Sequence, residues 1–278
     1  MKKLFIVEEQ SLPYNAKTPV GKYAWTRGST KDLLLHEALP WAVSEGAPLQ
    51  ELDGAVLIRA GLHEARKHDS DRSLDGSNLY QVVNTLLVAH RSKGGWTVSY
   101  CRLPNSDEGV KLAEQGYKLN KNNQKLVVPL DDKVLRAMTD EAQKHGRVVP
   151  ALDTNELKLD LKRDYARHPH MIAAFGGKEH GRKVAAVNAA YLQDRKCDFG
   201  YLWQLNVADL EKILPNNDPS AQTHAVVRRV GLGGDLYDVI DSVSANGSFS
   251  SYGRARGGTS CTREISSGNK GRVVVSAK

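Results

Sequence analysis

The clearest structural signal in the sequence lies between residues 126 and 152. Leu126 to Leu130 form an apolar run that is typical of a buried strand. Asp131 is a suitable N-cap for a helix over residues 132–145, whose apolar residues recur at helical spacing before Gly146. Val148-Val149 then begins a second strand. This order of strand, helix and strand predicts a βαβ-like unit at 126–152, and therefore a sheet with helices packed on it.

Other segments support the same fold class. The periodicity of apolar residues predicts further strands at 3–8, 96–101, 157–161, 198–205 and 224–230. It predicts further helices at 30–39, 79–93, 107–115, 178–193 and 207–214, while residues 54–67 fit either a strand or a helix. We therefore expect an α/β or α+β protein with a mixed sheet and flanking helices.

The composition changes after Pro215. Residues 216–220 (Asn-Asn-Asp-Pro-Ser) have the composition of a linker, and residues 242–271 are rich in serine and glycine. We therefore expect a mixed α/β globular core over 1–215, with a sub-boundary near 117–125. Residues 216–278 are expected to hold a linker, short strands and a flexible, basic Gly/Ser/Arg-rich C-terminal arm.

The net charge is positive. The chain has 39 lysines and arginines against 32 acids, a formal charge of +7. Residues 111–183 alone hold 15 basic residues against 10 acidic ones. A basic field of this kind attracts phosphates, so the leading hypothesis is a nucleic-acid-binding protein. RNA is slightly favoured over DNA, because no segment reads as a recognition helix.

The candidate contact residues lie in two groups. The first is a basic face within 158–183, where lysines and arginines are joined by Tyr165, which could stack on a base. The second is the Arg-Ala-Arg-Gly-Gly stretch of the C-terminal arm, which has the composition of segments that fold onto RNA. The predicted nucleic-acid-binding residues are Lys158, Lys162, Arg163, Arg167, Lys178, Arg182, Lys183, Arg254 and Arg256.

Two other functions stay open on the sequence alone. One is a metal-dependent nuclease or phosphoryl-transfer enzyme, with magnesium held by Glu8, Asp69 and Asp71, or by Asp153 and Glu156 beside Lys158. The other is a structural subunit that self-assembles into a homo-oligomer through the C-terminal arm. Whether the protein is an enzyme is left open, and no catalytic residue, metal site or cofactor is assigned.

The sequence also indicates a cellular location. It has no uninterrupted run of 18 apolar residues and no apolar N-terminal stretch long enough for a signal peptide, so no membrane partner is expected. Its three cysteines are far apart and odd in number, which fits a reducing compartment. A cytoplasmic protein is therefore expected.

Overall fold

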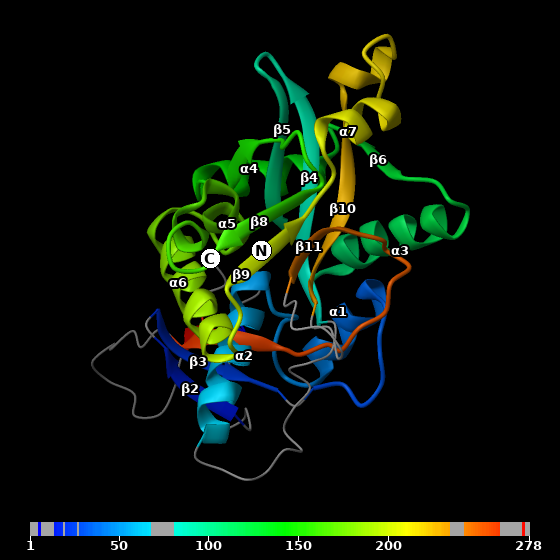
Figure 1. Cartoon of the computed structure of the whole chain (residues 1–278). Coiled ribbons are helices and arrows are strands. Elements are labelled where there is room, and N and C mark those ends of the chain that lie inside the picture. Colours follow the sequence, from blue (N-terminus) through cyan, green and yellow to red (C-terminus); the bar gives the residue numbers. More distant parts are fainter. Residues whose placement is uncertain are drawn as a thin grey trace.

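The computed structural model describes residues 5–6, 14–18, 20–26, 28–67, 81–233, 242–261 and 274–275. Its centre is a mixed sheet, shown in Figure 1. The strands follow the order β7 (Val148–Pro150), β5 (Gly95–Arg102), β4 (Gln81–Ser92), β10 (His224–Gly233), β11 (Ser242–Gly247), β9 (Phe199–Trp203) and β8 (Glu156–Asp160). An eighth strand, β6 (Leu126–Pro129), pairs with β10 beside this row. Only the pair β11–β9 is parallel among the described strands of this sheet.

Helices cover both faces of this sheet. Buried side chains of one cluster come from α2 (Leu52–Lys67), α5 (Pro169–Ala174), α6 (Lys178–Asp194) and α7 (Val207–Ile213). Buried side chains of the second cluster come from α1 (Leu35–Ser44), α3 (Asp107–Lys121) and α4 (Lys133–Lys144). The expected fold class, a mixed sheet with flanking helices, is confirmed.

The strand–helix–strand unit predicted at 126–152 is present as β6, α4 and β7. The chain of antiparallel pairings between them makes β6 and β7 run in the same direction, with β10, β4 and β5 in between. The helix begins one residue later than the sequence predicts, because the Asp132 carboxylate accepts hydrogen bonds from the amides of Val134 and Leu135, both at 2.9 Å.

The helix predicted at 79–93 is wrong, because β4 occupies most of that range. Val83 and Leu87 face one buried cluster, and Val82 and Leu86 face the other. A strand that is covered on both faces has no polar alternation, so its apolar residues can match helical spacing by chance. The ambiguous range 54–67 is helical and belongs to α2.

Two smaller sheets complete the described strands. β12 (Gly258–Cys261), β3 (Gly21–Trp25) and β2 (Tyr14–Thr18) form one, and β1 (Phe5–Ile6) pairs with β13 (Val274–Val275) in the other. Short 3₁₀ helices occur at Tyr165–Arg167 and at Pro219–Gln222, where the sequence predicts a linker.

The helix α3 continues past Gly116, where the sequence predicts its end. A Cβ atom at Gly116 would lie 2.6 Å from the Phe249 ring, so the missing side chain leaves the space that this ring fills. The glycine therefore serves packing at this position and does not end the helix.

The described part of the predicted arm, residues 242–261, is held by backbone hydrogen bonds to distant segments. The amides of Thr26, Ser29 and Leu33 donate to carbonyls of Gly257, Ala255 and Gly253 at 2.8–3.0 Å. Other bonds join residues 254–258 to Pro48, Gln50 and Val82. The order of this Gly/Ser-rich segment comes from backbone hydrogen bonds, which composition does not reveal. Residues 262–273 and 276–278 of the arm lie outside the described residues.

Candidate functional site

The hairpin of β8 and β9 has one buried side and one exposed side. Phe199, Tyr201 and Trp203 alternate with Gly200 and Leu202 along β9, and successive side chains of a strand point to opposite faces. Gly200 and Leu202 are buried, whereas Phe199 and Trp203 each keep 40% of their surface exposed. Burial of an aromatic ring is strongly favourable, so two rings left in solvent on one strand need a reason other than folding.

Neighbouring strands extend this exposed side. Lys158 of β8 lies opposite Tyr201, and Ser242 and Ser244 of β11 lie opposite Tyr201 and Trp203. Figure 1 shows β8, β9 and β11 side by side. We call this surface the aromatic face and define it by Phe199, Tyr201, Trp203, Lys158, Ser242 and Ser244.

The buried side fixes the hairpin. A Cβ atom at Gly200 would lie 2.2 Å from the Tyr165 ring, so only glycine leaves room for that ring. The Tyr165 hydroxyl accepts a hydrogen bond of 2.6 Å from the Asn188 amide of α6. The aromatic face therefore stands on a strand that is held from below by α6 and the 3₁₀ helix Tyr165–Arg167.

Lys158 carries the one positive charge of the aromatic face. Its ammonium lies 4.1 Å from the centroid of the Phe199 ring and 5.8 Å from that of Tyr201, which is cation–π geometry. No carboxylate among the described residues pairs with it. Asp160, two residues along, is already bound by Arg163 at 3.2 Å and by the amides of Lys162 and Arg163.

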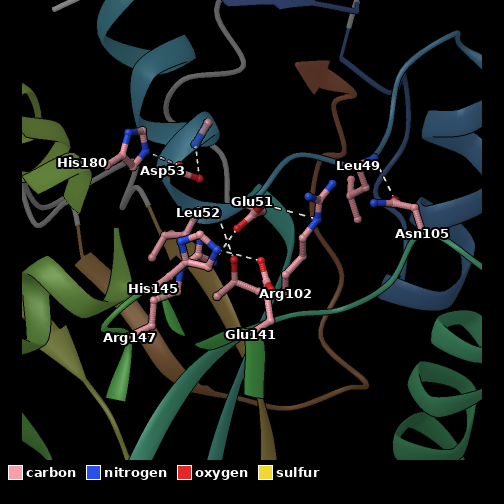
Figure 2. Close-up of polar contacts among 12 residues, drawn as sticks. Leu49, Glu51, Leu52, Asp53, Arg102, Asn105, Glu141, His145, Arg147 and His180 are labelled. Atoms are coloured by element: carbon pink, nitrogen blue, oxygen red, sulfur yellow. Dashed lines mark hydrogen bonds and ion pairs between the residues drawn. The ribbon is translucent and has the colours of Figure 1, made fainter. Parts of the chain in front are cut away.

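A second cluster of charged side chains lies where α2 begins (Figure 2). Glu51 is bound by Arg147 at 2.7 Å and by Arg102 at 3.4 Å. Asp53, in the first turn of α2, accepts from His180 of α6 at 2.7 Å and from the amide of Gly54 at 2.8 Å. Each carboxylate in this cluster is matched by a cation of the same chain.

The environment shifts the pKa of both members of the Asp53–His180 pair. Burial by itself raises the pKa of Asp53, but the hydrogen bond and charge of His180 and the charge of Arg147 outweigh it, and the pKa lies below its usual value. The hydrogen bond to Asp53 raises the pKa of His180 against the opposing effect of desolvation. The pair therefore ties α2 to α6 as an ion pair while His180 is protonated.

The structure spreads the predicted nucleic-acid-binding residues over separate elements. Lys158 lies on β8, Lys162 and Arg163 in the turn after it, and Arg167 in the following 3₁₀ helix. Lys178, Arg182 and Lys183 are exposed on α6, and the Lys178 ammonium donates to the Lys144 carbonyl at 2.8 Å.

The two arginines of the predicted arm are held by the chain itself. Arg254 pairs with Asp32 at 3.1 Å and donates to the Ser29 carbonyl at 2.9 Å. Arg256 is only 7% exposed. Both guanidinium groups are therefore engaged or buried within the described part of the chain.

The residues of the nuclease hypothesis do not form a metal site where they can be placed. Within residues 81–233 and the other described ranges, no group of three or more histidines, cysteines or acids could hold a metal ion. Glu8, Asp69 and Asp71 lie outside the described residues. In the same described part of the chain no helix is long and apolar enough to cross a membrane.

Sequence reasoning found the strand at 198–205 but missed its exposed aromatic side. The signal is the alternation of Phe199, Tyr201 and Trp203 with Gly200 and Leu202. In a strand packed on one face, either the aromatic residues or Gly200 and Leu202 can point inward. The Tyr165 ring packed against Gly200 shows that the glycine side points inward.

Comparison with known proteins identifies the fold. No protein-family model matches the sequence, and no curated protein matches it. The chain is similar to a solved structure from Nanoarchaeota that concerns the accommodation of massive sequence variation by the C-type lectin fold. The similarity covers 83% of this chain and 95% of that one, with a TM-score of 0.52 and 13% sequence identity.

At this identity the similarity shows the fold alone, so the chain has a C-type lectin fold. This finding overturns the nucleic-acid-binding hypothesis, because the C-type lectin fold is a different fold from that of a nucleic-acid-binding protein. The positive net charge misled the prediction, since net charge says nothing about where the cations lie.

Proposed function

We propose that this protein is a recognition protein that binds another protein through the aromatic face. The observation that carries the proposal is the exposure of Phe199 and Trp203, 40% each, at alternate positions of a strand whose other side is packed. Tryptophan and tyrosine are enriched among the residues that dominate the binding energy of protein interfaces. Serines beside them, as at Ser242 and Ser244, resemble the composition of antibody binding loops.

The position of Lys158 favours a protein partner over a carbohydrate. A sugar ring would stack on the face of an aromatic ring, but the Lys158 ammonium already covers the Phe199 ring at 4.1 Å. A protein partner can contact ring edges, hydroxyls and the lysine together, so it does not need that ring face to be open.

The similar structure supports different roles for the two sides of β9, one in holding the fold and the other in binding. The Nanoarchaeota work concerns a fold that accommodates massive sequence variation. In this chain, Gly200 and Leu202 pack on the buried side and hold the strand, while Phe199 and Trp203 on the other side keep 40% of their surface exposed. Outward residues of this kind can set the choice of partner without changing the fold. We also propose a cytoplasmic location, which Cys101, a buried cysteine that forms no disulfide, supports.

The test uses a random peptide library displayed on phage. Peptides selected on the wild-type protein should bind the double variant Phe199→Ser/Trp203→Ser at least about tenfold more weakly. Truncation of a side chain that dominates an interface typically costs more than about 1 kcal/mol of binding free energy. Val43→Ser/Tyr252→Ser is the matched control, since those residues are 40% and 55% exposed on other elements. This control should bind as the wild type does.

Two results would overturn the proposal. Equal binding of the selected peptides to the wild type and to the Phe199/Trp203 variant would place the binding surface elsewhere. The second result is that the wild type binds glycans on an array but no peptide, and that the Phe199/Trp203 variant loses the glycan binding. The partner would then be a carbohydrate and not a protein.

A further inference from the structure

The partner's chemistry can be read from the environment of Lys158, provided that the aromatic face is the binding surface proposed above. Lys158 lies in the middle of this face, opposite Tyr201 and over the Phe199 ring. A partner that covers the rings of Phe199, Tyr201 and Trp203 therefore also removes water from the Lys158 ammonium. An ammonium that loses water without gaining a counter-charge is strongly unfavourable.

No acid among the described residues is placed to provide that counter-charge. Asp160 already accepts from Arg163 and from two backbone amides. Glu156 lies two residues from Lys158 on the same side of β8, roughly 7 Å along the strand, and forms no ion pair with it. The 4.1 Å contact with Phe199 holds the ammonium over that ring. Among the described residues the Lys158 ammonium is therefore left without a counter-charge, which a carboxylate of the partner can supply.

The edge of β8 excludes binding by strand addition. β8 directs the N–H and C=O groups of its even-numbered residues away from β9, since Leu161 donates to Asp198 and Gln204 donates to Asn155. The Thr154 hydroxyl occupies both backbone groups of Glu156, and the Asp160 carbonyl accepts from the amide of Asp164. Only the short stretch at Lys158 and the amide of Asp160 remain, which is too little edge for a partner strand.

We infer that the partner places a carboxylate against the Lys158 ammonium, surrounded by apolar side chains that pack on Phe199, Tyr201 and Trp203. The contact is made between side chains. The ring contact restrains the lysine before binding, so less side-chain entropy is lost when the ion pair forms. Once covered, the pair lies in a medium of lower dielectric constant, where its attraction is stronger than at an open surface.

The experiment is a double-mutant cycle between the protein and the peptides selected on it. Each peptide is resynthesised with its aspartates and glutamates changed to asparagine and glutamine. Both forms are titrated against the wild type, Lys158→Met and the control Lys162→Met, whose exposed lysine lies four residues away outside the aromatic face. Methionine keeps the length and apolar stem of lysine and removes the charge.

We expect the acid-to-amide change to weaken binding to the wild type by roughly tenfold and to have little effect on Lys158→Met, which means that the two changes are coupled. Lys162→Met should behave as the wild type. Glu156→Gln should tighten the binding of acidic peptides, because it removes a negative charge roughly 7 Å from the incoming carboxylate.

The outcomes separate this inference from the function on which it rests. Two results would overturn the inference: absence of coupling between the peptide acids and Lys158, or weaker binding of acidic peptides to Glu156→Gln. In either case, loss of binding in Phe199→Ser/Trp203→Ser would still support the proposed function. If that double variant binds as the wild type does, both are wrong. Circular dichroism of each variant confirms that the exposed substitutions leave the fold intact.

Discussion

Two regions of this protein differ in how their charges are balanced. In the cluster at the start of α2, Glu51 is held by Arg102 and Arg147, and Asp53 by His180. On the aromatic face, Lys158 contacts two rings and no described carboxylate. The first arrangement is complete among the described residues and therefore serves the fold, whereas the second lacks a counter-charge there, which the partner proposed above would supply.

Among substitutions of charged side chains, the largest loss of stability should come from breaking the ion pairs of Glu51. Glu51→Ala leaves Arg102 and Arg147 without their shared carboxylate, and we expect it to lower the free energy of unfolding by about 2–3 kcal/mol, less than for a fully buried pair because part of Glu51 reaches solvent. Urea denaturation measures this value. The control Glu211→Ala removes an exposed partner of Arg91 and should cost less than about 1 kcal/mol. Equal effects would mean that the cluster contributes no more than a surface pair.

A smaller, pH-dependent effect should come from His180→Gln. The pKa of His180 is raised in the folded state, so its pairing stabilises the fold fully below the ordinary histidine pKa of 6.5 and this contribution is lost as the pH rises through the raised value. The pKa of Asp53 is lowered, so its contribution is present above its ordinary value of 3.8 and lost as the pH falls through the lowered value.

The difference in stability between the wild type and His180→Gln should therefore be larger at pH 5.5 than at pH 8.5. Urea denaturation of both proteins at the two pH values measures it. A difference that does not change with pH would show that the imidazole acts here through packing alone.

The smallest loss of stability should come from a substitution on the aromatic face. Trp203→Ser removes a ring that is 40% exposed, and we expect the free energy of unfolding to change by no more than about 0.5 kcal/mol. Leu202→Ala, the next residue along and on the buried side, should cost about 2–5 kcal/mol. If Trp203→Ser destabilises the protein as much as Leu202→Ala does, then the aromatic face is part of the core and the comparison fails.

Much of the fold could be predicted from local patterns. The strand–helix–strand unit at 126–152 and the helix α6 have regular apolar spacing and clear ends, so their positions follow from the sequence. β4 could not be predicted in the same way, because Val82, Val83, Leu86 and Leu87 are all buried and no polar face remains to mark a strand.

The candidate site was harder to predict than the fold. The sequence analysis counted cations between Lys158 and Lys183, but it could not show that Lys158 lies on aromatic rings while Lys178 donates to a helix end. It also treated the stretch around Arg256 as an arm, although backbone contacts with distant segments bury it. Pairings between residues far apart in the chain decide these roles, and a local pattern does not contain them.

The path of residues 253–258 has a consequence for how the protein is made. The amides of Thr26, Ser29, Leu33, Gln50 and Val82 all donate to carbonyls of this one segment. It leaves the ribosome after every one of those partners, as does β11, which lies between β10 and β9. During translation the amides of the earlier segments therefore stay bonded to water, and the native sheet can close only after β11 and residues 253–258 have emerged.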